Sequence, residues 1–153
     1  MAVNCSSVVP SPLDVSPVRS PQRVHSYLAG YVRGRQLVEL GTRNGDGIAC
    51  FSLAAASATA VELVPKYCEQ LKLRAARGTA PPHFNVLCRR YQAGLPDADV
   101  YTWWQQPPSF ANSAVLAFLH KEQKRGAIRA TAEAEKLGDA ATIRNLACAL
   151  AVR

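Results

Sequence analysis

The sequence lacks the cysteine and histidine patterns that hold metal ions in proteins. Its five cysteines are widely spaced and form no Cys-x-x-Cys pair, and its three histidines do not stand at the spacing of zinc ligands. We therefore expect no metal site. An odd number of scattered cysteines is typical of small buried hydrophobic residues in a reducing compartment, so we predict a cytoplasmic protein with unpaired cysteines.

Long apolar runs are also missing. No stretch approaches the ~18 consecutive apolar residues of a membrane span, so we expect no contact with a membrane. Residues 1–22 are rich in serine and proline and lack the continuous apolar core of a secretory signal, which predicts a flexible tail. An organelle transit peptide is the alternative for this segment. Residues 23–153 are long enough for a single domain with its own core.

Runs of like charge are absent although basic residues are in excess. The 18 lysines and arginines outnumber the 11 aspartates and glutamates, which gives a net charge of +7, but they are scattered along the chain. A basic protein attracts polyanions, so nucleic acid stays open as a partner. The lack of a basic segment interleaved with aromatic residues argues against a nucleic-acid-binding protein.

What the sequence does contain is an alternation of short apolar runs and longer amphipathic segments. The short runs predict strands at residues 37–40, 58–61, 84–88, 100–104 and 127–132. The amphipathic segments predict helices at residues 24–31, 48–57, 65–77, 112–125 and 139–151, with Asn112 or Ser113 and Asp139 as caps of the last two. This order predicts an α/β fold with a mainly parallel sheet of about five strands and helices on both faces.

The most informative segment is VELGTRNGDG at residues 38–47, where an apolar run ends in a glycine-rich turn before a predicted helix. Glu62 ends the next predicted strand, 23 residues after Glu39. Glycines let a backbone approach a ligand closely, and an acid at this strand end can accept hydrogen bonds from ribose hydroxyls. The segment therefore predicts a site for the nucleoside part of a cofactor.

The glycine spacing argues against NAD as that cofactor. A dinucleotide site has the pattern G-x-G-x-x-G, whereas the glycines here are residues 41, 45 and 47. The carboxylate of Glu39 would repel a diphosphate, but it suits a positively charged ligand with an amino group, such as S-adenosylmethionine.

Residues 38–45 resemble the first motif of class I, Rossmann-like S-adenosylmethionine-dependent methyltransferases, and residues 60–65 resemble their second motif. The resemblance covers about residues 30–110 and implies a Rossmann-like fold. It implies cofactor contacts by Glu39, Gly41, Thr42, Arg43, Asn44, Gly45, Glu62, Leu63 and Tyr91. Glu39 and Gly41 would line the methionine and ribose side, Glu62 would bind the ribose, and Arg90 or Tyr91 would lie near the adenine. The alternative is that the glycines only make a tight turn and that Glu62 is an ordinary strand-end carboxylate.

The end of the fourth predicted strand is where this family holds its reacting groups. It reads WWQQPPSF at residues 103–110 and contains no aspartate that would hold magnesium. Residues 106–108 are weakly similar to the [DNS]-P-P-[YFW] motif of amino-group methyltransferases. The candidate catalytic residues are therefore Trp104, Gln106 and Pro107. Methyl transfer depends mainly on alignment of the reactants, so the absence of an evident general base does not exclude activity.

Members of the family usually continue into a sixth and a seventh strand, which form an antiparallel hairpin. Because we expect only about five strands and a final helix, the resemblance implies a member that is truncated or divergent at its C-terminus. We predict a methyltransferase that acts on a small-molecule or protein acceptor. The alternatives are an inactive methyltransferase-like binding module and, after it, an NAD-binding oxidoreductase.

Overall fold

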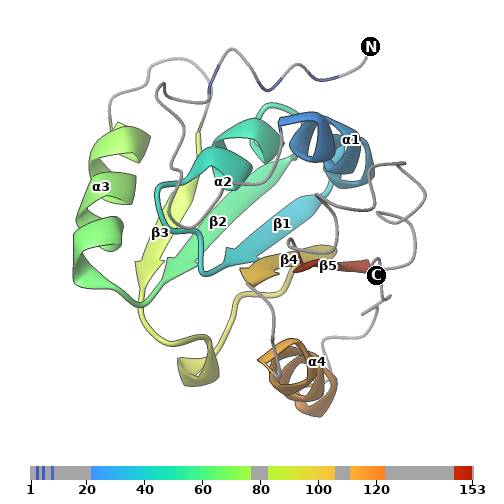
Figure 1. The fold of residues 1–153 in the computed structure, drawn as a ribbon, viewed down its shortest axis with the longest axis vertical. Coiled ribbons are helices and arrows are strands. Elements are labelled where there is room, and N and C mark those ends of the chain that lie inside the picture. Colours follow the sequence, from blue (N-terminus) through green and yellow to red (C-terminus); the bar gives the residue numbers. More distant parts are fainter. Residues whose placement is uncertain are drawn as a thin grey trace.

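The computed structural model describes Val3, Cys5, Val8 and residues 22–76, 83–105, 111–122 and 147–152 (Figure 1). In chain order, the elements of these ranges are α1 (Gln22–Val32), β1 (Gln36–Leu40), α2 (Asp46–Phe51), β2 (Ser57–Glu62), α3 (Pro65–Ala76), β3 (Asn85–Cys88), the 3-10 turn η2 (Tyr91–Ala93), β4 (Val100–Gln105), α4 (Ala111–Lys121) and β5 (Ala147–Val152). No helix in these ranges is both long enough and apolar enough to cross a membrane.

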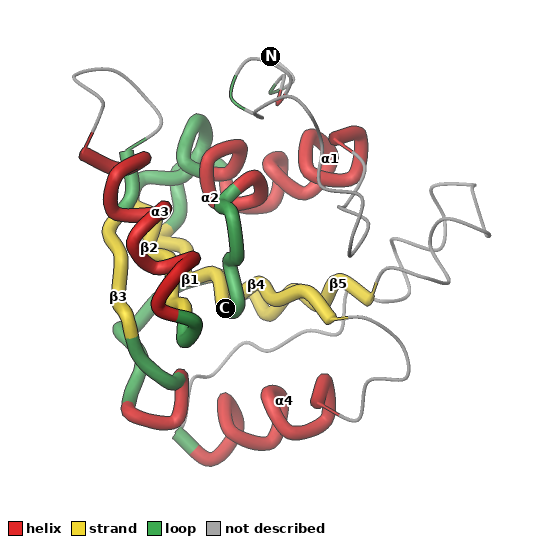
Figure 2. The backbone as a smooth tube through the Cα atoms, turned by 60° about the vertical axis from the view of Figure 1, so that its left-hand side comes forward, coloured by secondary structure: helices red, strands yellow, loops and turns green. Residues whose placement is uncertain are grey.

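The strands form one sheet in the order β3-β2-β1-β4-β5. The first four strands of this order are parallel, with β1 between β2 and β4, and β5 is antiparallel to β4. Helices α1, α2 and α3 lie on one side of the sheet and α4 lies on the other (Figures 1 and 2). The predicted α/β fold, with a mainly parallel sheet and helices on both faces, is confirmed.

Each face of the sheet has its own apolar core because side chains alternate along a strand. Leu37 of β1 belongs to the core that also holds Phe51 of α2 and Leu71 of α3. The next residue, Val38, belongs to the opposite core, which holds Leu119 of α4. Burial on both faces explains why apolar residues stand at consecutive positions in a central strand, as Leu37 and Val38 do in β1.

The helix and strand limits mostly follow local signals in the sequence. The helix predicted at residues 65–77 is α3, Pro65–Ala76, with proline in its first turn. The helix predicted at residues 48–57 is shorter, and α4 begins at Ala111, so Asn112 and Ser113 lie inside it and do not cap it. The strand predicted at residues 127–132 lies outside the described residues.

The prediction of a helix up to residue 151 is wrong in its last part. Residues Ala147–Val152 form β5 and pair with β4, with Ala151 opposite Tyr101 and Ala147 opposite Gln105. Alanine favours helices intrinsically, but the open edge of β4 offers unpaired backbone groups, and strand pairing overrides a weak propensity. Residues 139–146, including the predicted cap Asp139, lie outside the described residues.

The prediction of unpaired cysteines is also wrong. Disulfides join Cys5 to Cys50 and Cys68 to Cys88, with Cα–Cα distances of 4.9 Å and 5.7 Å that suit such bonds. The bonds close loops across 45 and 20 residues and leave no spacing signature in the sequence. Because disulfides persist mainly in oxidising compartments, they weigh against the reducing environment on which our cytoplasmic prediction rests.

Three residues of the segment predicted to be a flexible tail are packed against the domain. Cys5 is completely buried in the core beside α1 and α2, and Val3 and Val8 pack against the same core. The carbonyl oxygen of Val8 also accepts a hydrogen bond from the guanidinium of Arg74. The domain boundary at residue 23 stays a prediction.

Candidate functional site

An open pocket with a volume of about 190 Å³ lies where β1, β2 and β3 end. It is lined by Leu40, Gly41, Val61, Glu62, Leu63, Arg89, Arg90, Tyr91 and Gln92. The arrowheads of these three strands point to the same edge of the sheet (Figure 1). In parallel α/β sheets, ligands bind outside the carboxyl ends of the strands, so the pocket lies at the ligand-binding edge of the fold.

The glycine-rich loop after β1 is built on left-handed backbone conformations. Gly41 has a φ of 66° and Gly45 has a φ of 84°, which glycine adopts without the steric penalty of a Cβ. Arg43 has a φ of 51° and is the non-glycine residue with positive φ among those described. Its guanidinium donates to the hydroxyl of Tyr67 at 2.8 Å and lies over that ring. The loop is therefore anchored to α3 by the side chain of a conformationally strained residue.

Glu62 connects this loop to the turn after β2. Its Oε2 accepts a hydrogen bond from the backbone N–H of Arg43 at 2.7 Å. Its Oε1 accepts hydrogen bonds from the N–H groups of Leu63 and Val64, both at 2.9 Å. A carboxylate has about four acceptor positions, so three backbone donors leave room for about one donor from a ligand. Glu62 both shapes the pocket wall and retains some capacity to bind a hydroxyl group.

Glu39 lies beneath the loop and is not among the residues that line the pocket, although Leu40, which follows it, does line it. Its side chain is 1% exposed, and a Cβ on Gly47 of α2 would clash with its carboxylate. Thr102 stands opposite Glu39 in the pairing of β1 with β4 and is completely buried. The absence of a side chain at Gly47 is therefore what lets α2 approach the buried carboxylate.

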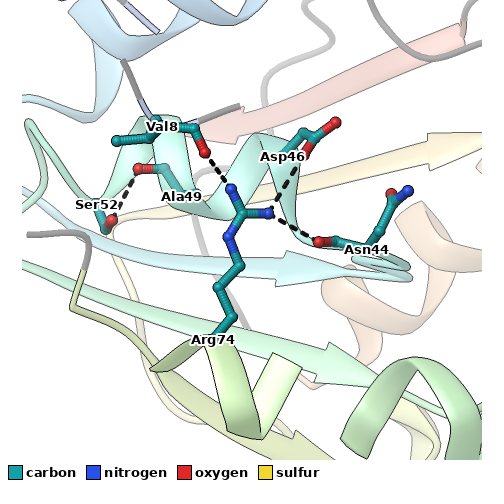
Figure 3. Close-up of polar contacts among 6 residues, drawn as sticks. All are labelled: Val8, Asn44, Asp46, Ala49, Ser52 and Arg74. Carbon is teal, nitrogen blue, oxygen red and sulfur yellow. Dashed lines mark hydrogen bonds and ion pairs between the residues drawn. The ribbon is translucent and has the colours of Figure 1, made fainter. Parts of the chain in front are cut away.

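Arg74 of α3 connects the loop to the helix layer (Figure 3). Its guanidinium donates to the carbonyl oxygen of Asn44 at 2.9 Å and to Oδ1 of Asp46 at 3.3 Å, and it reaches the carbonyl of Val8. The side chains of Arg74 and Asp46 are only 20% and 6% exposed. One cation thus holds the loop, the start of α2 and the N-terminal segment together.

Replacing Arg74 with alanine is expected to lower the free energy of unfolding by about 2 kcal/mol, because a largely buried carboxylate and two carbonyl groups lose a charged donor. Urea denaturation followed by circular dichroism measures this change. Lys72→Ala on the same helix is the matched control, since its pair with Glu69 is exposed and should contribute less than about 0.5 kcal/mol. Equal stability losses in the two variants would contradict the role of Arg74.

The structure gathers only some of the predicted site residues at the pocket. The predicted residues that line it are Gly41, Glu62, Leu63 and Tyr91. Those that build the loop beside it are Thr42, Arg43, Asn44 and Gly45. Trp104 belongs to β4, on the other side of β1 from β2, and its side chain lies outside the described part of the chain. Gln106 and Pro107 also lie outside the described residues.

The sequence analysis did not assign Arg89 and Gln92 to the site. Arg89 and its neighbour Arg90 are exposed, and neither guanidinium has a hydrogen bond or an ion pair with another described residue. Tyr91 packs edge-on against Phe118 of α4, with ring centroids 5.1 Å apart. The sequence could have pointed to Arg89 and Gln92 through their position just after a predicted strand. Residues that directly follow a parallel strand lie at the ligand-binding edge of the sheet.

The described residues contain no group of three or more histidine, cysteine, aspartate or glutamate side chains placed to hold a metal ion. The pocket offers a ligand the carboxylate of Glu62, which still has room for about one hydrogen-bond donor, and the apolar side chain of Leu63. It also offers two exposed guanidinium groups, those of Arg89 and Arg90. Leu63 is 54% exposed and supplies apolar surface to the pocket wall.

The strand order, the parallel direction of four strands, the helices on both faces and the pocket at the strand ends define the Rossmann-like fold of class I S-adenosylmethionine-dependent methyltransferases. Comparison with solved structures leads to the same fold. The structure is similar to an S-adenosylhomocysteine-bound methyltransferase from Podospora anserina, with a TM-score of 0.59, 11% identity, and coverage of 80% of this chain and 55% of that one.

Two further structures have the same core. A tRNA (m1A58) methyltransferase from Aquifex aeolicus has a TM-score of 0.51 and 10% identity, with 67% of this chain and 53% of that chain covered. A precorrin 8W decarboxylase from Methanobacterium thermoautotrophicum has a TM-score of 0.52 and 9% identity, with 71% of this chain and 76% of that chain covered. The chain therefore spans about half the length of the two methyltransferases. No protein-family model and no curated protein matches the sequence.

Proposed function

We propose that this protein binds S-adenosylmethionine in the pocket at the strand ends and transfers its methyl group to an acceptor. The observation that carries the proposal is the position of Glu62, a 4% exposed carboxylate that lines the pocket and ends β2. A carboxylate at that position in this fold can accept hydrogen bonds from a ribose. With three backbone donors already bound, Glu62 is fixed in place before any ligand arrives.

The remaining walls of the pocket suit a nucleoside. Leu63 and Tyr91 offer apolar surface to a flat base, and Gly41 lets the ligand approach the backbone where β1 ends. Glu39 would act from beneath the loop as a buried negative charge, which favours a cationic ligand over a diphosphate. When bound, S-adenosylmethionine supplies a methyl group on a positively charged sulfur. The protein would hold the cofactor, align the acceptor and exclude water.

The charge of the outer pocket wall bears on the acceptor. Arg89 and Arg90 line the pocket, are exposed and have no anionic partner among the described residues. Unpaired guanidinium groups bind carboxylates and phosphates well. We therefore infer that the acceptor is a small molecule or protein that carries negative charge and that these arginines attract to this wall of the pocket. Transfer of a labelled methyl group to a cell extract, separated into small molecules, proteins and nucleic acids, identifies the acceptor class and distinguishes an enzyme from an inactive binding module.

Calorimetric titration tests the cofactor. We expect S-adenosylmethionine and S-adenosylhomocysteine to bind with micromolar dissociation constants, adenosine to bind more weakly through the same pocket, and NAD not to bind. The reason is that the loop and Glu39 offer no place for a diphosphate, whereas Glu62 still has capacity for a ribose hydroxyl. If neither sulfur-containing ligand binds, or if NAD binds as well as they do, the proposal is wrong.

A further inference from the structure

The Cys68–Cys88 disulfide joins α3 to the last residue of β3, close in sequence to two of the segments that line the pocket. Cys88 is the last residue of β3 and directly precedes residues 89–92, which line the pocket. Cys68 lies in the first turns of α3, and its N–H donates to the carbonyl of Val64, in the turn that follows Glu62. Cys88 also stands opposite Glu62 in the pairing of β2 with β3. The bond therefore ties these two segments together next to the carboxylate of the site.

The two disulfides in the described part of the chain differ in accessibility. Cys5 and Cys50 are both completely buried, whereas Cys88 is exposed and Cys68 is 1% exposed. Thiol–disulfide exchange requires that a thiolate reach one of the two sulfur atoms. A reductant in solution can approach the exposed residue Cys88, whereas both residues of the other bond are completely buried. The bond beside the pocket is therefore the one suited to reversible reduction.

β3 has fewer buried side chains than the other parallel strands, so it depends on this bond to stay in place. It lies at the edge of the sheet, has four residues, and none of its side chains is fully buried. Segments with few buried apolar contacts open locally at low free-energy cost. Without the covalent link to α3, the end of β3 and residues 89–92 would keep the ladder to β2 and the contact of Tyr91 with Phe118, but they would lose their link to the turn after Glu62.

We propose that Cys68 and Cys88 form a redox-modification site that sets the affinity of the pocket for its nucleoside-containing ligand; this inference rests on the proposed function for the identity of that ligand. In the reducing direction, a thiolate of an added dithiol attacks Sγ of Cys88, the protein S–S bond breaks, and Cys68 leaves as a thiolate that takes up a proton. The second thiol of the reductant then resolves the mixed disulfide, giving two protein thiols and an oxidised dithiol. Exchange with a low-molecular-weight disulfide runs the reaction in reverse.

The test combines thiol mapping with calorimetry on the full chain carrying Cys148→Ser, so that the fifth cysteine does not contribute to the thiol count. Alkylation and mass spectrometry after graded dithiol treatment should show that Cys68 and Cys88 are reduced well before Cys5 and Cys50. At that reductant concentration, the dissociation constant of S-adenosylhomocysteine should rise at least about five-fold. Cys88→Ser should show the weaker affinity with and without reductant, and Cys5→Ser should still respond to reductant.

The outcomes separate this inference from the proposed function. Equal affinity in the oxidised and reduced forms would overturn the redox site and leave the cofactor assignment intact. Absence of binding in both forms would overturn the cofactor assignment and, with it, the coupling. If Cys5→Ser does not fold, the alkylation map of the parent protein shows which bond opens as the affinity falls. Loss of the far-ultraviolet circular dichroism signal on reduction would also overturn the inference, because the effect would then be global unfolding.

Discussion

Alanine in place of Glu62 is expected to weaken S-adenosylhomocysteine binding by at least about 100-fold and to lower the free energy of unfolding by about 3 kcal/mol. Three backbone N–H groups donate to this carboxylate, from the loop after β1 and from the turn after β2. Hydrogen bonds to a charged group contribute about 1.5–3 kcal/mol each, and water in the open pocket would replace part of that stabilisation. The loop would lose the acceptor that holds Arg43 at positive φ, so the binding site and the fold weaken together.

Two variants separate the contributions of Glu62. Glu62→Gln keeps an oxygen of the same reach but places an amide NH₂ against backbone donors, so we expect an intermediate loss of affinity and stability. Glu69→Ala removes an exposed carboxylate of α3 whose ion pair with Lys72 lies on the surface, and it should change neither quantity appreciably. Calorimetry and urea denaturation measure the two effects. Wild-type affinity in Glu62→Ala would show that this carboxylate does not hold the ligand.

The sequence predicted the fold well where the signals are local. Pro65 at the start of α3 is a helix-start signal that depends on the residue alone. The apolar run that became β1, buried on both faces, predicted a parallel strand for the same kind of reason. Ala147–Val152 was mispredicted because its conformation is decided by the edge of β4, which is distant in the sequence. Local propensity fails where pairing with a remote strand determines the structure.

The candidate site also has features that the sequence predicts and features that it does not. The spacing between Glu39 and Glu62 predicted a carboxylate beside a glycine-rich loop, because a strand–helix–strand unit has a nearly fixed length. The contact of Arg74 with the loop bridges 30 residues, and the Cys68–Cys88 bond closes a loop of 20 residues. Neither has a motif, since each arises from how α3 lies against the sheet. The burial of Glu39 beneath α2 was likewise hidden, because the sequence alone does not tell how closely a helix approaches a strand.

Gly47 determines that approach, and alanine at this position is expected to lower the free energy of unfolding by about 2–3 kcal/mol. The sign of this change in the free energy of unfolding is informative, because alanine in place of an uncrowded helical glycine normally stabilises a helix by up to ~1 kcal/mol. Here the new Cβ would overlap the carboxylate of Glu39, which is 1% exposed and therefore enclosed by other atoms. Either α2 must move away from the sheet or Glu39 must leave its rotamer, and both changes disturb the adjacent loop.

A matched control and a double mutant isolate this overlap. A Cβ added to Gly30 of α1 would meet no atom within 4 Å, so Gly30→Ala should be neutral or stabilising in the same urea denaturation experiment. Combining Gly47→Ala with Glu39→Ala removes the atoms that collide, and Gly47→Ala should then cost much less in the Glu39→Ala background than in the wild type. A stabilised Gly47→Ala variant, or strict additivity in the double mutant, would show that α2 tolerates a side chain here. In that case, the close contact between α2 and Glu39 would not explain why residue 47 is a glycine.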